Sequence, residues 1–417
     1  MLDINFIRQN VEIVKQSIKD RLINLDIDKL LSADDKRREI IIRLEEKRAF
    51  KNNSSKTKPT SEEIEELKNL GLEIKKLETE LEFVEIEYSR LIKQVPNLIH
   101  PDAPRGGEEE FKVLQTIGKI PEFDFDVKNH SELMENLNIV DFERGAKIAG
   151  SKFYFLKNDA VLLERALISY GLEVLQNYGF DLMITPDLAK DEILEGAGFN
   201  PRGDEDQIYK IEKEDLNLIG TAEIPLAGYH SNEIVNLSNG PIKYAGLSHC
   251  FRKEAGAYGR TSKGLYRVHQ FNKLEMFVFC KPEDSEKVHL ELLEIEQKIC
   301  NGLDFPYRII DTASGDLGSP AYRKYDLEAY MNMVGENGGY GEITSASNCT
   351  DYQARRLNIK YKKEDGSTEF VHTLNGTAIV TSRFPIAIIE NFQQEDGSIL
   401  IPKVLQKYLG KEKIERK

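Results

Sequence analysis

The sequence has no long apolar run and no feature of an exported protein. No stretch approaches the roughly 18 uninterrupted apolar residues of a membrane-spanning helix, so we expect no membrane span. Residues 1–5 do not form a basic region followed by an apolar block, so we also expect no signal peptide. Both absences favour a cytoplasmic protein.

Cysteine, histidine and glycine usage excludes further classes of protein. The four cysteines include no C-x-x-C pair, which argues for a reducing compartment and against a disulfide framework or a zinc knuckle. The seven histidines are scattered and support no metal site. No G-x-G-x-x-G follows a predicted strand and no G-x-x-x-x-G-K-[ST] occurs, so a nucleotide would need another kind of site.

The charge is negative overall but unevenly distributed. A net charge of -14 counts against a nucleic-acid binder. Residues 36–58, however, hold nine basic side chains against three acidic ones, whereas residues 60–95 hold ten glutamates against five basic side chains. A basic stripe on an acidic protein can still meet a phosphate backbone. The two oppositely charged segments could equally pair with each other.

Apolar residues recur with a heptad period near the N-terminus. Their spacing alternates between three and four, at Leu67, Leu70, Ile74, Leu77, Leu81, Val84, Tyr88, Leu91 and Val95. This seam predicts a long helix packed on a partner helix. Thr60 and Glu63 would form a capping box at its start, and Pro96 would end it.

The partner helix is expected directly upstream. Residues 34–53 are helical in composition, and a polar tip at residues 52–60 would join the two helices into an antiparallel coiled-coil hairpin. The period alone fits an oligomerisation coiled coil as well as an arm. It therefore supports a helical arm, and gives only weak support to RNA binding.

The remainder of the chain changes character. Residues 96–107 are rich in proline and glycine and are expected to be a linker. Helices are predicted at residues 161–178, 285–301 and 384–391. Strands are predicted at residues 180–186, 242–247, 274–279, 325–330 and 378–381. This order predicts an α+β fold on an antiparallel sheet, with domains at residues 1–107 and 108–417.

The densest polar cluster suggests a strand, a basic glycine-rich loop and a second strand. Arg252 and Glu254 would share a face of the first strand, and Arg267, Phe271 and Glu275 a face of the second. Such a face can clamp a nucleotide, because arginine suits phosphate oxygens and an aromatic ring stacks on a base. The alternative is a solvated, charged strand.

This cluster resembles motif 2 of the class II aminoacyl-tRNA synthetases in its seryl form. The likeness rests on Phe251-Arg-x-Glu254 and on Arg267-Val-His-Gln-Phe-x-Lys-x-Glu275. Further segments resemble the amino-acid loop (Gly220-Thr-Ala-Glu223), the region before motif 3 (Lys324-Tyr-Asp-Leu-Glu328, Glu342-Ile-Thr-Ser345, Ser347-Asn348, Tyr352-Gln-Ala-Arg-Arg356), motif 3 (Asn375-Gly-Thr377, Arg383, Ile389-Glu-Asn391-Phe-Gln393) and motif 1 (residues 161–186). With the hairpin as the family's tRNA arm, the likeness covers nearly the whole chain.

The resemblance implies a serine–tRNA ligase with a class II antiparallel sheet flanked by helices. It assigns catalysis to Arg252, Arg383 and Glu342. It assigns ATP binding to Arg252, Lys253, Glu254, Arg267, Phe271, Glu342, Ile343, Thr344, Ser345 and Arg383. It assigns serine binding to Thr221, Ala222, Glu223, Glu275 and Thr377, and Mg²⁺ to Glu342 and Ser345. The implied partners are L-serine, tRNA(Ser), tRNA(Sec) as an open alternative, and a second copy of the chain bound through motif 1.

Structural explanations compete with several of these roles. Glu223 and Glu328 could be members of buried ion pairs, Ser345 a turn residue, and His249 and His269 hydrogen-bonded structural residues. The segment at residues 352–356 is expected to brace the sheet.

Three departures from the family pattern and three rival functions accompany the resemblance. Gly220 stands where the family usually has proline, Ala378 replaces a common glycine, and residues 330–333 lack the usual Trp/Pro pair. The rivals are a ligase that charges a carrier protein, a non-catalytic paralogue, and a threonyl- or prolyl-type synthetase. The predicted arm disfavours the first rival, and the hairpin together with the Arg267–Glu275 stretch disfavours the third. The second is disfavoured because the chain retains Arg252, Glu275, Glu342 and Arg383.

Overall fold

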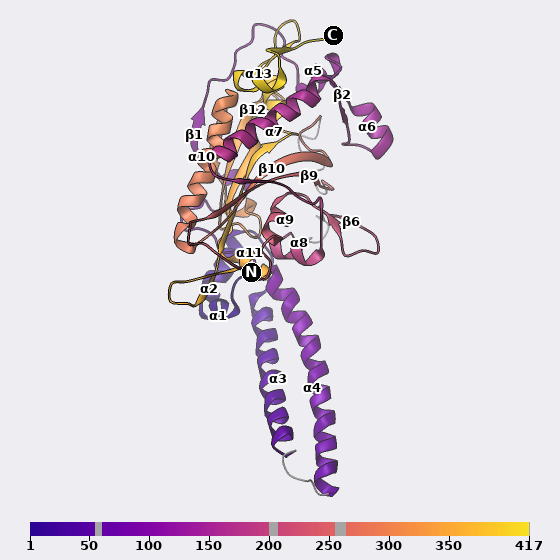
Figure 1. Ribbon diagram of the computed structural model, residues 1–417, viewed down its shortest axis with the longest axis vertical. Coiled ribbons are helices and arrows are strands. Elements are labelled where there is room, and N and C mark those ends of the chain that lie inside the picture. Colours follow the sequence, from indigo (N-terminus) through magenta and orange to yellow (C-terminus); the bar gives the residue numbers. More distant parts are fainter. Residues whose placement is uncertain (55–60, 200–206, 255–263, 417) are drawn as a thin grey trace. The chain divides into compact units, whose positions relative to one another are not determined.

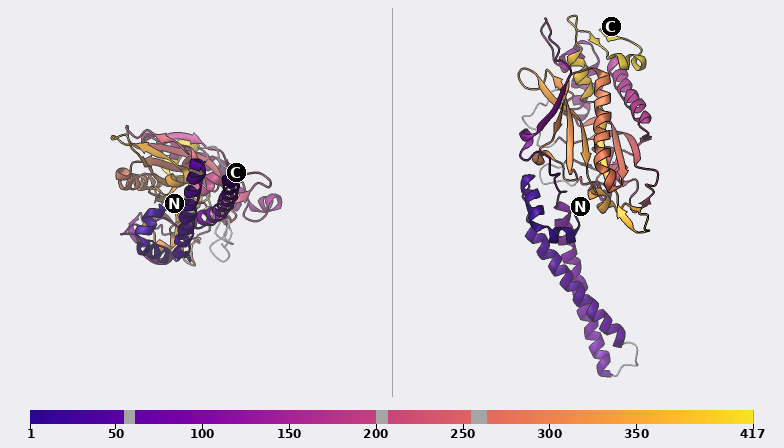
Figure 2. Two further views of the ribbon diagram at one scale, coloured as in Figure 1. Left: turned by 90° about the horizontal axis from the view of Figure 1, so that it is seen from below. Right: turned by 90° about the vertical axis from the view of Figure 1, so that its left-hand side faces the viewer.

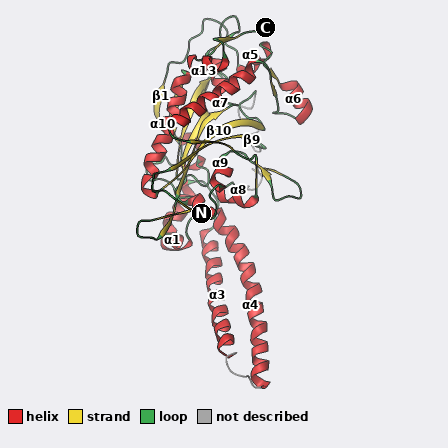
Figure 3. Ribbon diagram, viewed as in Figure 1, coloured by secondary structure: helices red, strands yellow, loops and turns green. Residues whose placement is uncertain are grey.

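The chain folds into two compact units, Met1–Leu98 and Ile99–Lys417. The computed structural model describes residues 1–54, 61–199, 207–254 and 264–416. Figure 3 shows that the first unit is helical, whereas the second combines helices with a large sheet. The domain boundary that the sequence analysis placed after residue 107 stays a prediction.

The first unit contains the predicted helical hairpin. Its described helices are α1 (Ile4–Gln9), α2 (Val11–Asp20), α3 (Ile27–Ser54) and α4 (Ser61–Gln94). Figure 1 shows α3 and α4 side by side as a hairpin. Within it, Ile40 and Leu44 pack with Ile74 and Leu77 in one buried cluster. Helix α4 ends at Gln94, which confirms the prediction that Pro96 would end it. Residues 52–54 of the predicted polar tip belong to the end of α3, and the rest of the tip and the capping box fall outside the described residues.

The opposite charges of the two hairpin helices pair with each other in part. The Lys47 ammonium lies 2.6 Å from the Glu73 carboxylate, and the Arg48 guanidinium lies 2.7 Å from Glu78. These pairs are exposed to solvent and screened, so the buried apolar seam provides most of the packing energy.

The second unit is built on an eight-stranded sheet with the order β1-β11-β12-β13-β16-β10-β9-β4. The described strands are β1 (Lys112–Ile117), β4 (Asp181–Ile184), β9 (Ile242–Phe251), β10 (Gln270–Cys280), β11 (Tyr307–Asp311), β12 (Arg323–Met331), β13 (Gly339–Asn348) and β16 (His372–Val380). Neighbouring strands are antiparallel, except that β4 runs parallel to β9. The predicted α+β fold on an antiparallel sheet is confirmed.

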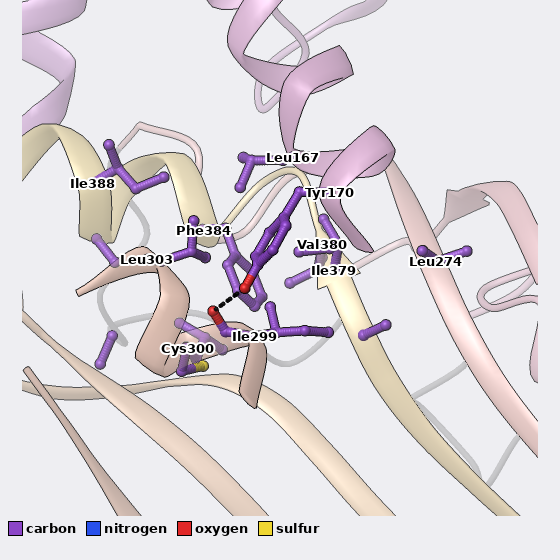
Figure 4. Close-up of a cluster of buried hydrophobic side chains, with 14 of the residues drawn as sticks. Leu167, Tyr170, Leu274, Ile299, Cys300, Leu303, Ile379, Val380, Phe384 and Ile388 are labelled. Atoms are coloured by element: carbon purple, nitrogen blue, oxygen red, sulfur yellow. Dashed lines mark hydrogen bonds between the residues drawn. The ribbon is translucent and has the colours of Figure 1, made fainter. Parts of the chain in front are cut away.

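Helices cover one face of this sheet and enclose the main core. Helices α7 (Asp159–Asn177), α10 (Ser285–Leu303), α12 (Phe384–Asn391) and α13 (Lys403–Leu409) pack there (Figures 1 and 2). Figure 4 shows Tyr170 of α7 among Leu303, Phe384 and Ile379, with its hydroxyl donating to the carbonyl of Ile299 at 3.4 Å. Part of the opposite face is covered by a second apolar cluster, which includes Phe277, Phe279 and Leu226, and the rest of it carries polar side chains.

Smaller elements complete the described part of the second unit. The helices are α5 (His130–Asn136), α6 (Phe142–Ala149), α8 (Asp191–Ala197), α9 (Glu223–Gly228) and α11 (Tyr352–Leu357), with 3₁₀ turns at Glu108–Glu110, Pro282–Asp284 and Ser314–Asp316. The short strands are β2 (Val140–Asp141), β3 (Phe155–Leu156), β5 (Leu188–Ala189), β6 (Tyr209–Lys210), β7 (Asn217–Leu218), β8 (Ile234–Val235), β14 (Lys360–Lys362), β15 (Thr368–Phe370), β17 (Ile399–Leu400) and β18 (Lys413–Ile414).

The predicted strand hairpin of the nucleotide site is wrong at the end of its first strand and at the start of its second. Strand β9 stops at Phe251, so Arg252 and Glu254 do not share a strand face. Glu254 has φ = 50°, a left-handed conformation that an extended strand cannot contain. Strand β10 begins at Gln270, so Arg267 precedes it. The glycine-rich loop at residues 255–263 lies outside the described residues.

The structure also bears on the membrane-spanning helices and the disulfides that the sequence analysis argued against. Within the described ranges, no helix is long and apolar enough to cross a membrane. Cys250, Cys280, Cys300 and Cys349 are all buried and free, as expected for a chain without disulfides.

Candidate active site

A polar hollow lies on the sheet face opposite α7 and α10. Leu274 of β10 faces Gly171 of α7, so Lys273 and Glu275, on either side of it, point to the other face. One hollow is lined by Arg252, Glu254, Tyr266, Val268, Phe271, Lys273, Glu342, Ile343, Ser345, Thr377, Val380, Ser382 and Arg383. A second, of about 540 Å³, is lined in part by Thr221, Glu223, Glu275, Asp316, Lys324, Ser347 and Asn375. Both include Arg252, Lys273, Glu342 and Ser345, so they adjoin.

Arg252 is held where the two hollows meet. Its Nε donates to the carbonyl oxygen of Gly220 at 3.2 Å, and its guanidinium lies 5.4 Å from the centre of the Phe271 ring. His269 Nδ1 donates to the carbonyl of Arg252 at 2.9 Å. A Cβ at Gly220 would meet only ordinary contacts, so the space around this residue does not require glycine.

Arg383, Glu342 and Tyr266 form a second charged group. Arg383 Nη1 lies 3.1 Å from Glu342 Oε1 and donates to the main-chain oxygen of Glu342 at 3.0 Å. The Tyr266 ring lies 5.0 Å from the guanidinium carbon of Arg383, a cation–π distance. Burial raises the pKa of Glu342, but the positive charges of Arg383, Lys324 and Arg252 outweigh it and lower that pKa below its ordinary value. The carboxylate is therefore ionised.

Glu223 lies on the acidic side of the larger hollow, at the start of α9. Gly246 of β9 has no side chain, so that Ala222 can pack against it; a Cβ at Gly246 would lie 3.2 Å from that of Ala222. Thr221 Oγ1 accepts from the Glu223 amide at 3.2 Å. Burial, together with the nearby Glu275 carboxylate, raises the pKa of Glu223 to about 7.

Glu275 and Lys273 form a buried ion pair on β10. The Lys273 ammonium lies 2.5 Å from the Glu275 carboxylate, and Thr377 of β16 is the cross-strand neighbour of Glu275. Burial raises the pKa of Glu275, and Lys273 opposes that shift. Lys273 borders both hollows, and the sequence assigned it no role.

The structure brings most of the predicted site residues together. Those that line one of the two hollows are Arg252, Glu254, Phe271, Glu342, Ile343, Ser345, Arg383, Thr377, Thr221, Glu223 and Glu275. Four predicted residues line neither hollow, namely Lys253, Arg267, Thr344 and Ala222. Arg267 Nη1 lies 3.5 Å from Glu254 Oε2, so it reaches the rim of the site. The Thr344 hydroxyl donates to Glu296 of α10 at 2.9 Å, on the other side of the sheet.

The contacts in the structure test the structural roles that the sequence analysis offered as alternatives for several residues. Glu328 forms an ion pair with Arg308, as its alternative explanation held. Ser345 lies within β13, so the turn explanation is wrong. His249 pairs with Asp187 at 2.8 Å and lines neither hollow. Gln353 of α11 holds the Glu223 carboxylate, which agrees with a bracing role for residues 352–356.

The oxygen ligands available for a metal are few. In the described part of the chain, no group of three or more His, Cys, Asp or Glu side chains could hold an ion. Glu342 and Ser345, on one strand, offer a carboxylate and a hydroxyl at the hollow. Mg²⁺ is commonly held by one or two carboxylates together with substrate phosphates, so this pair fits an ion that enters with a polyphosphate.

The fold and this hollow define the class II aminoacyl-tRNA synthetase core. A family model described as "tRNA synthetase class II core domain (G, H, P, S and T)" matches residues 208–392, which include every predicted site residue. A second model, "Seryl-tRNA synthetase N-terminal domain", matches residues 1–99, the helical unit. The chain belongs to the seryl-tRNA synthetase family of aminoacyl-tRNA ligases.

Individual relatives agree along the whole length. The serine–tRNA ligase of Treponema denticola is 53% identical over 423 residues, covering 99% of this chain and 100% of the relative. That of Borreliella burgdorferi is 52% identical over 418 residues, covering 98% of each. The crystal structure of the Pyrococcus horikoshii seryl-tRNA synthetase complexed with ATP superimposes with a TM-score of 0.90 at 38% identity, covering 100% of both chains. The Naegleria fowleri cytoplasmic enzyme in complex with AMP has a TM-score of 0.85 at 33% identity, covering 100% of this chain and 99% of that one.

Proposed function

We propose that this chain activates L-serine with ATP and transfers it to tRNA(Ser), with the reaction at Arg252. The observation that carries this proposal is the position of Arg252, which borders both hollows. A guanidinium at that junction can neutralise the α-phosphate while the amino acid approaches from the acidic side.

The smaller hollow is the proposed nucleotide site. Arg252 would bind the α-phosphate, Phe271 would stack on adenine, and Glu254 would accept from the adenine amine. The γ-phosphate end would lie between Arg383 and Arg267. Lys253, Ile343 and Thr344 would contribute through the main chain. The side chains of Lys253 and Thr344 do not line the hollow, and that of Ile343 is apolar.

Mg²⁺ is proposed at Glu342 and Ser345, where it would cancel negative charge on the triphosphate. The ionised Glu342 carboxylate is held by Arg383 at 3.1 Å. Arg383 borders the same hollow and would bind phosphate oxygens. The oxygen ligands of this pair support Mg²⁺ over softer metals.

The larger hollow is the proposed serine site. Glu223 and Glu275 can accept from the serine ammonium, with Thr221 in the same hollow and Ala222 shaping the loop. Thr377, the cross-strand neighbour of Glu275, would approach serine from the smaller hollow. A site that hydrogen-bonds the serine hydroxyl can reject alanine by roughly 10⁴, because its polar groups would be left unpaired. Threonine must be excluded by shape.

The activation step needs alignment and charge neutralisation rather than a general base. The serine carboxylate is already a nucleophile and attacks the α-phosphorus, and diphosphate leaves in line. Arg252 and Arg383 stabilise the charge that develops on phosphate oxygens. In the second step a ribose hydroxyl of the terminal adenosine attacks the seryl carbonyl and AMP leaves, with the adenylate phosphate as one acceptor for the released proton.

The α3–α4 hairpin is proposed to bind tRNA, and motif 1 to form a homodimer in the cytoplasm. The arm favours tRNA over a carrier protein as the acceptor, and tRNA(Sec) remains a second substrate to assay. Strand β4 is an edge strand whose Ile184 side chain is 85% exposed. An exposed apolar edge of this kind supports a partner surface.

The test is ATP–diphosphate exchange measured with each of the twenty amino acids. We expect serine alone to support rapid exchange, and Arg252→Ala to abolish it while sedimentation stays unchanged. Exchange with another amino acid, or normal exchange in Arg252→Ala, would contradict the proposal. Charging of tRNA(Ser), tRNA(Sec) and a carrier protein by the active enzyme then identifies the acceptor.

A further inference from the structure

His130, the first residue of α5, is buried between α12 and the main chain at Leu265. It is 1% exposed, and Glu390 in the last turn of α12 is 0% exposed. The His130 Nδ1 lies 2.8 Å from Glu390 Oε1, and the His130 backbone amide donates to the same oxygen at 2.8 Å. Its Nε2 lies 3.1 Å from the Leu265 amide nitrogen.

These contacts fix the hydrogen positions on the imidazole. A backbone N–H can only donate, so Nε2 accepts from Leu265 and the proton resides on Nδ1, facing Glu390. The ring is therefore a neutral bridge between a carboxylate and a main-chain amide. A carboxylate that orients an imidazole in this way sets the direction of the other nitrogen.

Further bonds tie the segment before α5 to the end of α12. Gln393 Oε1 accepts from the Lys128 amide at 2.9 Å, and its Nε2 donates to the Lys128 carbonyl at 3.0 Å. Glu390 Oε2 also accepts from the Met333 amide at 3.1 Å. His130 is thus attached rigidly to α12, and what it holds is fixed relative to that helix.

Both ends of helix α12 are linked to the short segment formed by Leu265 and Tyr266. Arg383 directly precedes its first residue, with the guanidinium carbon 5.0 Å from the centre of the Tyr266 ring, while Glu390 reaches Leu265 through His130. Gly264, with φ = 65°, comes directly before this segment. A Cβ there would collide with the His130 ring, so the close approach requires glycine.

We propose that His130 is a positioning residue for the triphosphate end of ATP. It fixes Leu265, and through it Tyr266 and Arg267, against Arg383. This inference rests on the proposed function, which assigns the γ-phosphate end to Arg383 and Arg267. It predicts a loss of affinity that is specific to ATP, since AMP lacks the groups that these arginines would hold.

The test compares His130→Gln with His130→Asn. A glutamine amide can reach the place of Nε2 and keep an acceptor for Leu265, whereas asparagine reaches only the place of Nδ1. We expect His130→Asn to raise the Kd for ATP about tenfold, as for loss of one buried hydrogen bond, while the Kd values for AMP and serine stay within about twofold. His130→Gln should stay within about threefold of the unmodified protein for all three.

The matched control is His230, whose Nδ1 also pairs with a glutamate, Glu233, at 2.7 Å but which lines neither hollow. His230→Asn should leave all three Kd values unchanged. Gly264→Ala provides an independent variant and should reproduce the ATP-specific loss. Thermal melts confirm that each variant is folded at the assay temperature.

The outcomes separate this inference from the function on which it rests. If Arg383→Ala weakens ATP selectively but His130→Asn and Gly264→Ala do not, the positioning role of His130 is wrong. If His130→Asn weakens ATP, AMP and serine equally, His130 is only structural. If the unmodified protein shows no serine-dependent exchange, the proposed function itself fails.

Discussion

Gln353 donates a 2.7 Å hydrogen bond to the carboxylate of Glu223, although 130 residues separate them in the chain. Asn375 donates to the same oxygen, Oε1, at 3.0 Å, and the Thr373 hydroxyl donates to Gln353 at 2.7 Å. Two elements, α11 and β16, thereby fix one acidic group at the wall of the larger hollow. Such a group is exposed to ligand and costly to ionise, which gives it a measurable pH dependence.

Glu223→Gln should change the pH dependence of stability. Burial and Glu275 raise the pKa of Glu223 from 4.5 to about 7. Because the folded-state pKa lies above the unfolded value, the stability that the protonated group contributes is complete below about pH 4.5 and is lost as pH rises through about 7. The side chain of the variant cannot ionise. The Tm of the variant minus the Tm of the unmodified protein should therefore increase by several degrees from pH 5 to pH 8. Thermal melts at both pH values measure this, and a Tm difference that is constant with pH would contradict it.

Glu342→Gln should impair the use of Mg²⁺ more than it impairs folding. The variant keeps the shape of the side chain and the main-chain contact with Arg383 but loses the charge that Mg²⁺ requires. We expect serine-dependent exchange to fall about 10²-fold and the Mg²⁺ concentration for half-maximal rate to rise. Glu328→Gln is the matched control, since Glu328 pairs with Arg308 and lines neither hollow. An unchanged Mg²⁺ dependence in Glu342→Gln would remove Glu342 from the metal site.

Shortening the α3–α4 hairpin should separate activation from transfer. Removing residues 38–86 and closing the gap with a short glycine linker retains the basal cluster of Ile7, Val14, Leu30, Leu91 and Val95. Exchange of ATP with diphosphate should stay within about twofold, because the predicted ATP and serine residues all lie in the second unit. Charging of tRNA(Ser) should be lost, since the arm would supply basic contacts to the phosphate backbone. Charging at a normal rate would refute the arm's role.

Ile184→Asp should convert the proposed homodimer into a monomer. Ile184 is 85% exposed on the edge strand β4, and a buried charge at a packed interface is strongly unfavourable. Sedimentation velocity should show half the mass at micromolar concentration, with an unchanged far-ultraviolet spectrum. Ile148→Asp, at a residue 74% exposed on α6 and outside motif 1, is the control. A dimer that survives Ile184→Asp would move the interface elsewhere.

Local patterns in the sequence were sufficient for the hairpin and for several of the other helices and strands. The three–four spacing of Ile74, Leu77 and their neighbours predicted the hairpin, because a heptad seam specifies its own partner surface. The apolar periods of α7, α10 and α12 were likewise recognisable. Strand β13 was not predicted as a strand: Gly339, Gly341 and its polar residues give no alternation, and its strand conformation comes from pairing with β12 and β16.

The chemistry of the site residues was readable in the chain, but their environment was not. Residue types and spacing identified Arg252 and Phe271, because only certain side chains can bind phosphate and a base. Arg383 was identified through the resemblance to motif 3. Only the tertiary structure ended β9 before Arg252, turned Thr344 away from the hollow toward Glu296, and joined Glu223 to Gln353. Burial, charge neighbours and strand ends depend on segments far apart in sequence, so folding decides them and local pattern does not.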